Sequence, residues 1–432
     1  NINQITGDIP PGIGDLSQIS ELFLNNNNLT GPIPNSFCNL INNINMDLSS
    51  NELCPAYPTC FTDEQIGNQN TGGCPSCNVD EIGLYDDCYS QNDLDVLLAF
   101  AENSEWSIEY EDIIDDMGFQ TWNLSGRLTY WNCNNCDLID IIPSSIGNCT
   151  ELNELHLENN FLSGSIPPEI GNLNKAEKIS IDNNDLEGSI PSEIYSLPEL
   201  KHLSLAQNGL SGSLSSSISS LNSIQSLSLG GNNLTGIIPS EIGSLSELTF
   251  LDLRANNLSG SIPSEIGDIS TLILLYLDTN ELEGSIPSEI SNLDNLIGLY
   301  LYNNNLTGTI PLGIENLNNL DYFHINDNEL FGLIPDILCN LNIAWSDSSE
   351  SGIPYFQIQN NEFCPPYPSC LETVQIGDQY IILTEYYQDV DEDSFGNINQ
   401  PCAYQYCAEY PPLTGECTGY ENNSIDIDDN CF

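Results

Sequence analysis

Apolar and polar positions recur along most of this chain with a fixed period of 24 residues. Between residues 152 and 341 the same pattern is repeated eight times without a gap. In one copy, leucine stands at positions 248, 251, 253 and 258, and asparagine stands at 256. Leu251 and Leu253 are separated by one residue, which is the spacing that buries one face of a β-strand. Each period therefore predicts a short strand followed by a bend at the asparagine.

The asparagine of this frame keeps its register throughout, at positions 160, 184, 208, 232, 256, 280, 304 and 328. A period of this length that contains L-x-x-L-x-L-x-x-N-x-L is typical of a solenoid of leucine-rich repeats. Each repeat buries its leucines only against the turns before and after it. We therefore predict an α/β solenoid, a leucine-rich-repeat superhelix with a parallel sheet on its concave face. The stacked asparagines should form a ladder that satisfies backbone groups at the bends.

The segment LSGSIPSEIG, from Leu258 to Gly267, resembles the plant-type leucine-rich repeat of receptor-kinase ectodomains and polygalacturonase-inhibiting proteins. That family carries L-x-G-x-I-P after the ladder asparagine, and the resemblance covers residues 1–53 and 128–363. It implies the fold and says little about a ligand. One repeat has Leu214 and Ser215 in place of Ile-Pro, which predicts a locally irregular turn on the convex side.

The frame divides the chain into four parts. Residues 1–77 are predicted to be the C-terminal part of a first array with its Cys-rich cap, and residues 128–370 a second array with its own cap. Between them, residues 78–127 should form a linker and a helical N-terminal cap. The sequence QNDLDVLLAFAEN (91–103) predicts an amphipathic helix, and it resembles the D-x-x-x-LL-x-F helix of plant-type caps. Residues 371–432 are predicted to be an acidic, cysteine-containing linker that leads to a further cap.

The charge of the chain excludes one class of partner. Lysine and arginine total 5 against 63 aspartate and glutamate residues, which gives a net charge of −58. Nucleic acid binding needs the opposite sign, and an anionic membrane surface is disfavoured for the same reason. No apolar run approaches the ~20 residues that a membrane helix needs, so no membrane insertion is predicted. No signal peptide opens the sequence, and we expect a mature or partial secreted product.

Sixteen cysteines cluster near the ends of the arrays. This placement predicts disulfide-stapled caps and an extracellular or cell-surface location. Two equivalent sets of four should each be closed internally, with three connectivities possible for each set. The sets are Cys38, Cys54, Cys60 and Cys74, and Cys339, Cys364, Cys370 and Cys402. Cys136 occupies a ladder position, and we expect it to be a free buried thiol, a substitution that the plant-type family also shows.

Catalysis has little support in the sequence. The three histidines, at 156, 202 and 324, fall on different turns, and no Ser-His-Asp, Cys-His or metal-ligand spacing occurs. We predict no enzymatic activity and no cofactor, with calcium as the one open question. Asp389, Asp391 and Asp393 alternate ahead of a glycine, as in oxygen-ligand calcium loops. The stretch lacks the sixth-place glycine and closing glutamate of such loops, so a solvated acidic linker is the alternative.

Aromatic and charged residues collect on the predicted concave face over the last turns of the second array. They are Phe250, Asp252, Arg254, Tyr276, Asp278, Tyr300, Tyr302, Tyr322 and His324. Aromatic rings beside carboxylates are suited to a carbohydrate or peptide ligand. Alternatively, the tyrosines simply pack on one another across adjacent strands.

Seven N-x-S/T sequons predict glycosylation, at Asn28, Asn123, Asn148, Asn233, Asn257, Asn305 and Asn422. Four of them directly follow a ladder asparagine, so glycans there would line one edge of the solenoid. The alternative is coincidence, because NNLTG and NNLSG belong to the repeat itself.

Two hypotheses of function follow. The first is a non-enzymatic extracellular scaffold, structural or adhesive, that forms part of a tandem array or filament. It rests on a chain that begins inside a repeat, and its partners would be like subunits or tandem domains joined end to end. The second is a recognition ectodomain that binds a glycan or a peptide on the concave face.

Overall fold

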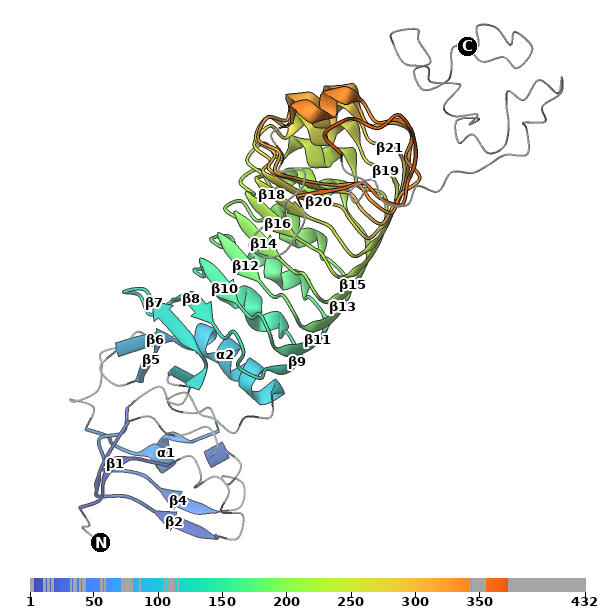
Figure 1. Ribbon diagram of the computed structural model, residues 1–432. Helices are drawn as coiled ribbons and strands as arrows, with labels where there is room; N and C mark the ends of the chain where they lie inside the picture. The colour runs from blue at the N-terminus through green and yellow to red at the C-terminus, as the bar shows by residue number, and fades with distance from the viewer. Residues whose placement is uncertain are drawn as a thin grey trace, which may run out of the picture. The chain divides into compact units, whose positions relative to one another are not determined.

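The computed structural model of the chain (Figure 1) describes residues 4–10, 13, 16, 19–31, 33, 37–38, 40, 44–54, 57, 60–70, 81–84, 87–104, 106, 113–114, 116–341, 343 and 355–371. These residues belong to two compact units, a first unit of residues 1–200 and a second unit of residues 201–432.

The leucine-spaced strands pair in parallel within each unit and form what we call the concave sheet. Leu251 pairs with Leu227 on one side and with Leu275 on the other, so the strands stay in the 24-residue register of the sequence. In the first unit the sheet contains β7 (Phe119–Trp122), β8 (Leu128–Asn132), β10 (Glu154–His156) and β12 (Lys178–Ser180), with β7 antiparallel to β8. In the second unit it contains β14 (His202–Ser204), β16 (Ser226–Ser228), β18 (Phe250–Asp252), β20 (Leu274–Tyr276), β22 (Gly298–Tyr300), β24 (Tyr322–His324) and β26 (Phe356–Gln357).

A second row of parallel strands follows the ladder asparagines. It contains β9 (Ile139–Ile141), β11 (Phe161–Ser165) and β13 (Asp185–Ser189) in the first unit, and β15 (Gly209–Ser213), β17 (Asn233–Gly236), β19 (Asn257–Ser261), β21 (Glu281–Ser285) and β23 (Asn305–Thr307) in the second. Strands β25 (Phe331–Leu333) and β27 (Glu362–Cys364) form a separate parallel pair.

Short 3₁₀ helices, rather than α-helices, complete each turn. They are η4 (Ser144–Asn148), η5 (Pro168–Asn172), η6 (Ser192–Ser196), η7 (Ser216–Ser220), η8 (Ser240–Ser244), η9 (Ser264–Asp268), η10 (Ser288–Asn292), η11 (Leu312–Asn316) and η12 (Asp336–Asn340). Between these layers lie the repeat leucines and isoleucines: Leu251, Leu253 and Leu258 are fully buried. Each such side chain contributes about 1.5–3 kcal/mol on burial. The predicted leucine-rich-repeat solenoid is confirmed.

The asparagine ladder joins each turn to the one before it. The side-chain oxygen of Asn256 accepts a hydrogen bond from the backbone N–H of Leu234 at 3.0 Å. Its amide nitrogen donates to the carbonyls of Leu229 and Leu253, both at 3.1 Å. The same three contacts recur at Asn160, Asn184, Asn232, Asn280, Asn304, Asn328 and Asn361. Because each of these asparagines bonds two turns, a slip of register would break all of these contacts.

The turn at Leu214 and Ser215 is regular, so the expectation of local irregularity is wrong. Helix η7 has five residues, as η8 does. Ser215 has φ −79° and ψ 142°, close to the −67° and 140° of Pro239 in the next repeat. The hydroxyl of Ser215 also accepts a hydrogen bond from the backbone N–H of Ser217 at 3.1 Å. Serine therefore replaces proline by capping the 3₁₀ helix.

The first array ends in a glutamine that takes over the ladder role. Its elements are β1 (Thr6–Asp8), β2 (Glu21–Phe23), β3 (Asn28–Thr30), β4 (Asn45–Asp47) and α1 (Asp63–Ile66), with β1 paired to β3 and β2 to β4. The side-chain oxygen of Gln69 accepts hydrogen bonds from the N–H groups of Asn51 and Leu53 at 3.2 and 3.3 Å. Its nitrogen donates to the carbonyls of Leu48 and Ile66. The segment QIGNQ (residues 65–69), which ends in this glutamine, thus closes the ladder.

The region before the second array is held by one buried carboxylate. It contains β5 (Glu81–Leu84) and β6 (Asp87–Ser90), which are antiparallel, and α2 (Gln91–Asn103), which coincides with the predicted helix. Asp93 of α2 is fully buried, and Arg127 donates to it at 2.8 and 3.0 Å. The backbone N–H of Leu128 also donates to Asp93, at 2.8 Å. Phe100 packs edge-on against the buried ring of Trp131.

Three disulfides join described cysteines. Cys38 pairs with Cys60 and Cys339 with Cys370, both with a Cα–Cα distance of 5.7 Å, and each bond lies within one of the two predicted sets. Cys54 and Cys364 are also disulfide-bonded. The remaining members, Cys74 and Cys402, lie outside the described residues.

The third disulfide corrects the expectation that Cys136 is a free thiol. Cys136 is bonded to Cys133, because the bend before the ladder position brings their Cα atoms to 5.3 Å. Among the described cysteines the free buried thiol is Cys149 instead, and burial raises its pKa well above the usual value.

Candidate ligand-binding face

The concave sheet of the second unit brings all nine residues of the predicted binding face together. The parallel register places Tyr276 between Asp252 and Tyr300, with His324 on the following strand. Phe250 and Tyr322 begin strands of the same sheet. Arg254, Asp278 and Tyr302 stand two residues beyond the central positions, on the same face by strand alternation. Their role in binding stays a prediction.

The aromatic residues form a continuous row across successive strands, which we call the aromatic row. Ring centroids lie 5.7 Å apart for Phe250 and Tyr276, and 4.4 Å apart for Tyr276 and Tyr300, whose planes differ by only 9°. Tyr300 and Tyr322 follow at 6.2 Å, and Tyr322 and Tyr355 at 5.0 Å. Tyr355 is not among the nine residues predicted for this face. The repeat frame resumes at Ile353, after an insert at residues 342–352, and it gives Tyr355 the position that Phe250 and Tyr322 have in their repeats.

A glycine makes room for the centre of the row. A Cβ atom on Gly298 would lie 2.8 Å from a ring carbon of Tyr300 and 2.8 Å from a methyl carbon of Leu274. Real Cβ atoms essentially never approach so closely, so one of these side chains would have to move. The position of the Tyr300 ring therefore requires a residue without a side chain at position 298.

Arg254 lies at one end of the row, fixed between a carboxylate and a ring. Its Nε and Nη2 donate to one oxygen of Asp252 at 3.0 and 2.8 Å. Its guanidinium carbon lies 4.3 Å from the ring centroid of Tyr276. Burial raises the pKa of Asp252, and the charge of Arg254 opposes that rise. The face of Tyr276 thus already binds a guanidinium, in the geometry of a cation–π contact.

Asp278 is the second buried carboxylate of this face, with an exposed fraction of 2%. Burial raises its pKa, and a hydrogen bond from Tyr302 works against that rise. The pKa of Tyr302 is raised to about 12 by burial and by the charge and hydrogen bond of Asp278. Tyr302 is therefore a neutral donor at neutral pH. Among the described residues, the Oδ1 atoms of Asp278 and Asn326 are buried without a hydrogen-bond partner.

The histidines lie where the repeat frame placed them, on three different strands. His324 is buried and packs edge-on against Tyr300, with ring centroids 5.0 Å apart. His156 lies between two carboxylates, Glu154 at 3.1 Å and Glu158 at 3.0 Å. We had not singled out this pair, although the alternation E-L-H-L-E puts all three side chains on one face.

The predicted calcium residues Asp389, Asp391 and Asp393 lie outside the described residues. Within the described part of the chain, no group of three or more His, Cys, Asp or Glu side chains is arranged to hold a metal ion. Nor does any described helix have the length and apolar character required to cross a membrane.

Five of the sequon asparagines are exposed, namely Asn28, Asn148, Asn233, Asn257 and Asn305. Asn123 is partly exposed, and Asn422 lies outside the described residues. Asn233, Asn257 and Asn305 each begin a strand of the second row, so they lie along one edge of the second unit. Their modification stays a prediction.

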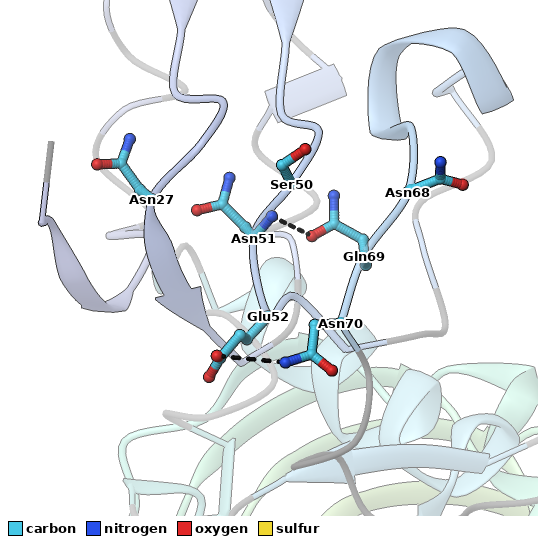
Figure 2. Close-up of a pocket in the computed structure, with 7 residues that line it drawn as sticks. All are labelled: Asn27, Ser50, Asn51, Glu52, Asn68, Gln69 and Asn70. Atoms are coloured by element: carbon cyan, nitrogen blue, oxygen red, sulfur yellow. Dashed lines mark hydrogen bonds between the residues drawn. The ribbon is translucent and has the colours of Figure 1, made fainter. Parts of the chain in front are cut away.

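Figure 2 shows an open polar depression at the end of the first array. It is lined by Asn27, Ser50, Asn51, Glu52, Asn68, Gln69 and Asn70. Two contacts cross it, from the backbone N–H of Asn51 to Gln69 at 3.2 Å and from the amide of Asn70 to Glu52 at 3.4 Å. Because Asn51 and Gln69 are engaged in closing the ladder, we assign this depression to the array end and not to a ligand.

Comparison with protein families supports the repeat assignment. One leucine-rich-repeat family model matches residues 198–258, and a second matches residues 18–40, 151–173, 295–317 and 319–341. None of the curated proteins compared with this sequence gives a significant match.

Several solved structures are similar to this chain. The plant peptide hormone receptor RGFR1, solved in complex with RGF2, is 26% identical, with a TM-score of 0.52 over 84% of this chain and 47% of the receptor chain. The chain thus spans about half the length of that receptor structure. The Arabidopsis receptor kinase HAESA, solved with the peptide hormone IDA and the co-receptor SERK1, is 24% identical, with a TM-score of 0.53 over 83% of this chain and 60% of its own.

A plant ice-binding protein is 22% identical, with a TM-score of 0.55 over 68% of this chain and 95% of its own. At these levels of identity HAESA and the ice-binding protein share the fold alone. Together with the 24-residue period and the asparagine ladder, the matches show that the chain is built of leucine-rich repeats, and these repeats resemble the plant type.

Proposed function

We propose that this chain is an extracellular recognition protein that binds a peptide on the concave sheet of its second unit. The observation that carries the proposal is the aromatic row. Tyr276, Tyr300 and Tyr322 are partly exposed, lie on successive strands and have charged residues beside them. The similarity to the peptide hormone receptor RGFR1 supports this choice over a glycan ligand.

The physical basis is the low entropic cost of binding to such a surface. Tyrosine offers a large, rigid, amphipathic contact area with few rotatable bonds. Here each ring is already held by its neighbours, as the 4.4 Å stacking of Tyr276 and Tyr300 shows. A ligand that packs on the row would order few side chains, so more of its contact energy would appear as affinity.

The disulfides support an oxidising, extracellular location, because such bonds persist mainly outside the cytosol. A non-enzymatic role is consistent with the histidines, which lie on three separate strands. We retain glycosylation at the seven sequons as part of the proposal. Glycans on Asn233, Asn257 and Asn305 would lie on the second strand row and leave the concave sheet free.

An array of synthetic linear peptides, probed with the purified chain, tests the proposal. Peptides that bind should lose about tenfold in affinity, or about 1.4 kcal/mol, when Tyr300→Ala is introduced. Ser228→Ala is the matched control, because it lies on the same sheet away from the row, and it should change affinity by less than about twofold. Failure of every peptide to bind, or equal binding by the Tyr300→Ala variant, would reject peptide recognition at this face.

A structural or adhesive scaffold is the second candidate. It is favoured by the repetition of the cap: the bonds Cys38–Cys60 and Cys339–Cys370 have the same Cα–Cα distance in two arrays of one chain. We propose the division into 1–77, 78–127, 128–370 and 371–432 on the same basis, with contacts between like units end to end. Electron microscopy and light scattering of native material test this candidate. Compact, monodisperse particles of 47.5 kDa would argue against it.

A further inference from the structure

Two buried oxygens on the candidate binding face have no hydrogen-bond partner among the described residues. They are Oδ1 of Asp278 and Oδ1 of Asn326, and the two residues are 2% and 6% exposed. Tyr302 stands between them in the repeat register, one turn from each. Unpartnered buried oxygens are uncommon because each costs about 1–3 kcal/mol. Because two such oxygens flank one half-buried tyrosine, they indicate hydrogen-bond acceptors for a donor that belongs to a ligand.

The contrast with Asp252 indicates the charge of that donor. Asp252 is equally buried, and Arg254 provides it with three hydrogen bonds, one of them from its backbone N–H, and with a cation that packs on the Tyr276 ring. Asp278 has no ion pair in the described part of the second unit, although the charge of Arg254 partly opposes the rise in its pKa from a greater distance. Lys201 and Arg254 are the only lysine or arginine residues between 201 and 432. A buried carboxylate without an ion-pair partner is costly, so a cation that also donates hydrogen bonds to it would offset part of that cost.

We propose that Asp278, Tyr302 and Asn326 form a subsite for a basic side chain of the ligand, most suitably a guanidinium. The inference rests on the proposed function, since it names the class of peptide that the concave sheet binds. The guanidinium donates to Asp278 and packs on the face of Tyr302, as Arg254 does on Tyr276. Oδ1 of Asn326, two turns and about 10 Å from Asp278 at the Cα atoms by strand spacing, accepts a neighbouring N–H of the same ligand.

Tyr302 controls access to the subsite. Its hydroxyl donates to Asp278 in the free protein, and its side chain is more exposed than that of Asp278. In the proposed complex Tyr302 rotates away from Asp278, and the guanidinium replaces its hydroxyl as donor in a bond in which both partners are charged. The net charge of −58 also concentrates cations near the surface, which favours encounter with a basic ligand.

The test uses a small matched pair of probes and the full chain, so it does not depend on finding a peptide. N-acetyl-arginine amide carries the guanidinium, and N-acetyl-citrulline amide has nearly the same shape without the charge. By ligand-observed NMR titration, the wild type should bind the arginine probe about tenfold more tightly than the citrulline probe. Asp278→Asn should reduce this ratio to within about twofold. Asp268→Asn, which removes the same charge from an exposed position on η9, should preserve the ratio.

The outcomes separate this inference from peptide recognition. Equal binding of the two probes by the wild type, or an unchanged preference in Asp278→Asn, overturns the basic subsite even if array peptides bind through Tyr300. An Asp278-dependent preference for the arginine probe supports the subsite even if no peptide binds. Circular dichroism of Asp278→Asn must match the wild type. Asn326→Leu offers a second variant, in which a lower affinity for the arginine probe supports the subsite and an unchanged affinity counts against it.

Discussion

The asparagine ladder gives the sharpest test of how this solenoid is held together. Asn256→Ala removes a side chain that is 7% exposed and bonded to two turns. The main lost contacts are one bond accepted from the N–H of Leu234 and two donated to the carbonyls of Leu229 and Leu253, at 3.0, 3.1 and 3.1 Å; the same amide nitrogen also lies 3.2 Å from the carbonyl oxygen of Arg254. At about 1 kcal/mol each, these three bonds predict a loss of about 3 kcal/mol in the free energy of unfolding.

The neighbouring position provides a matched control. Asn257 is exposed at the start of β19, so Asn257→Ala should change the free energy of unfolding by less than about 0.5 kcal/mol. Both variants should be produced in a host that does not glycosylate, because Asn257 belongs to a sequon. Urea unfolding with the disulfides intact measures the free energy. Native-state hydrogen exchange measures the local effect, which should be faster exchange of the Leu234 amide in Asn256→Ala.

Equal destabilisation by the two substitutions would show that the ladder does not carry the register. The same conclusion would follow if Asn256→Ala left the exchange of the Leu234 amide unchanged. Either result would refute the view that each asparagine links two turns, since the energetic difference between positions 256 and 257 is predicted from that linkage alone.

Three further predictions address the face and the cysteines. The raised pKa of Asp278 means that this carboxyl group binds its proton more tightly in the folded state than in the unfolded state. The contribution of Asp278 to the free energy of unfolding therefore falls as the pH rises from the ordinary pKa of aspartate through the raised pKa. In thermal unfolding at pH 7, Asp278→Asn should be more stable than the wild type by on the order of 1 kcal/mol. The difference should vanish in acid, and a variant that is less stable than the wild type at pH 7 would contradict the prediction. Gly298→Ala should displace the Tyr300 ring, and this should change the near-ultraviolet circular dichroism spectrum. It should also weaken peptide binding about as much as Tyr300→Ala does. An unchanged spectrum and an unchanged affinity would show that the ring has room for the added methyl group. Alkylation of the native protein should leave Cys149 unmodified, and peptide mapping should recover Cys133 linked to Cys136; rapid labelling of Cys149 or of Cys136 would refute these assignments.

The sequence by itself determined the fold, the register and the membership of each face. The reason is the period: once Leu251, Leu253 and Asn256 are placed, every residue 24 positions away occupies the same environment. That is why Tyr276, Tyr300 and His324 could be assigned to one face before the structure was known. The α2 helix lies outside the repeats, and it was predicted from the helical spacing of its own apolar residues.

Only the tertiary structure decided which side chains meet. The pairing of Asp93 with Arg127 spans 34 residues and depends on how α2 packs against β8. The Cys133–Cys136 bond depends on the path of one bend, and the regular turn at Ser215 on a single hydroxyl rotamer. Arg254 turns toward Asp252 and Tyr276 and donates its hydrogen bonds to Asp252, so Asp278 has no ion pair among the described residues. A repeating pattern specifies positions, but rotamers and distances between neighbouring turns decide contacts, and those differ from one repeat to the next.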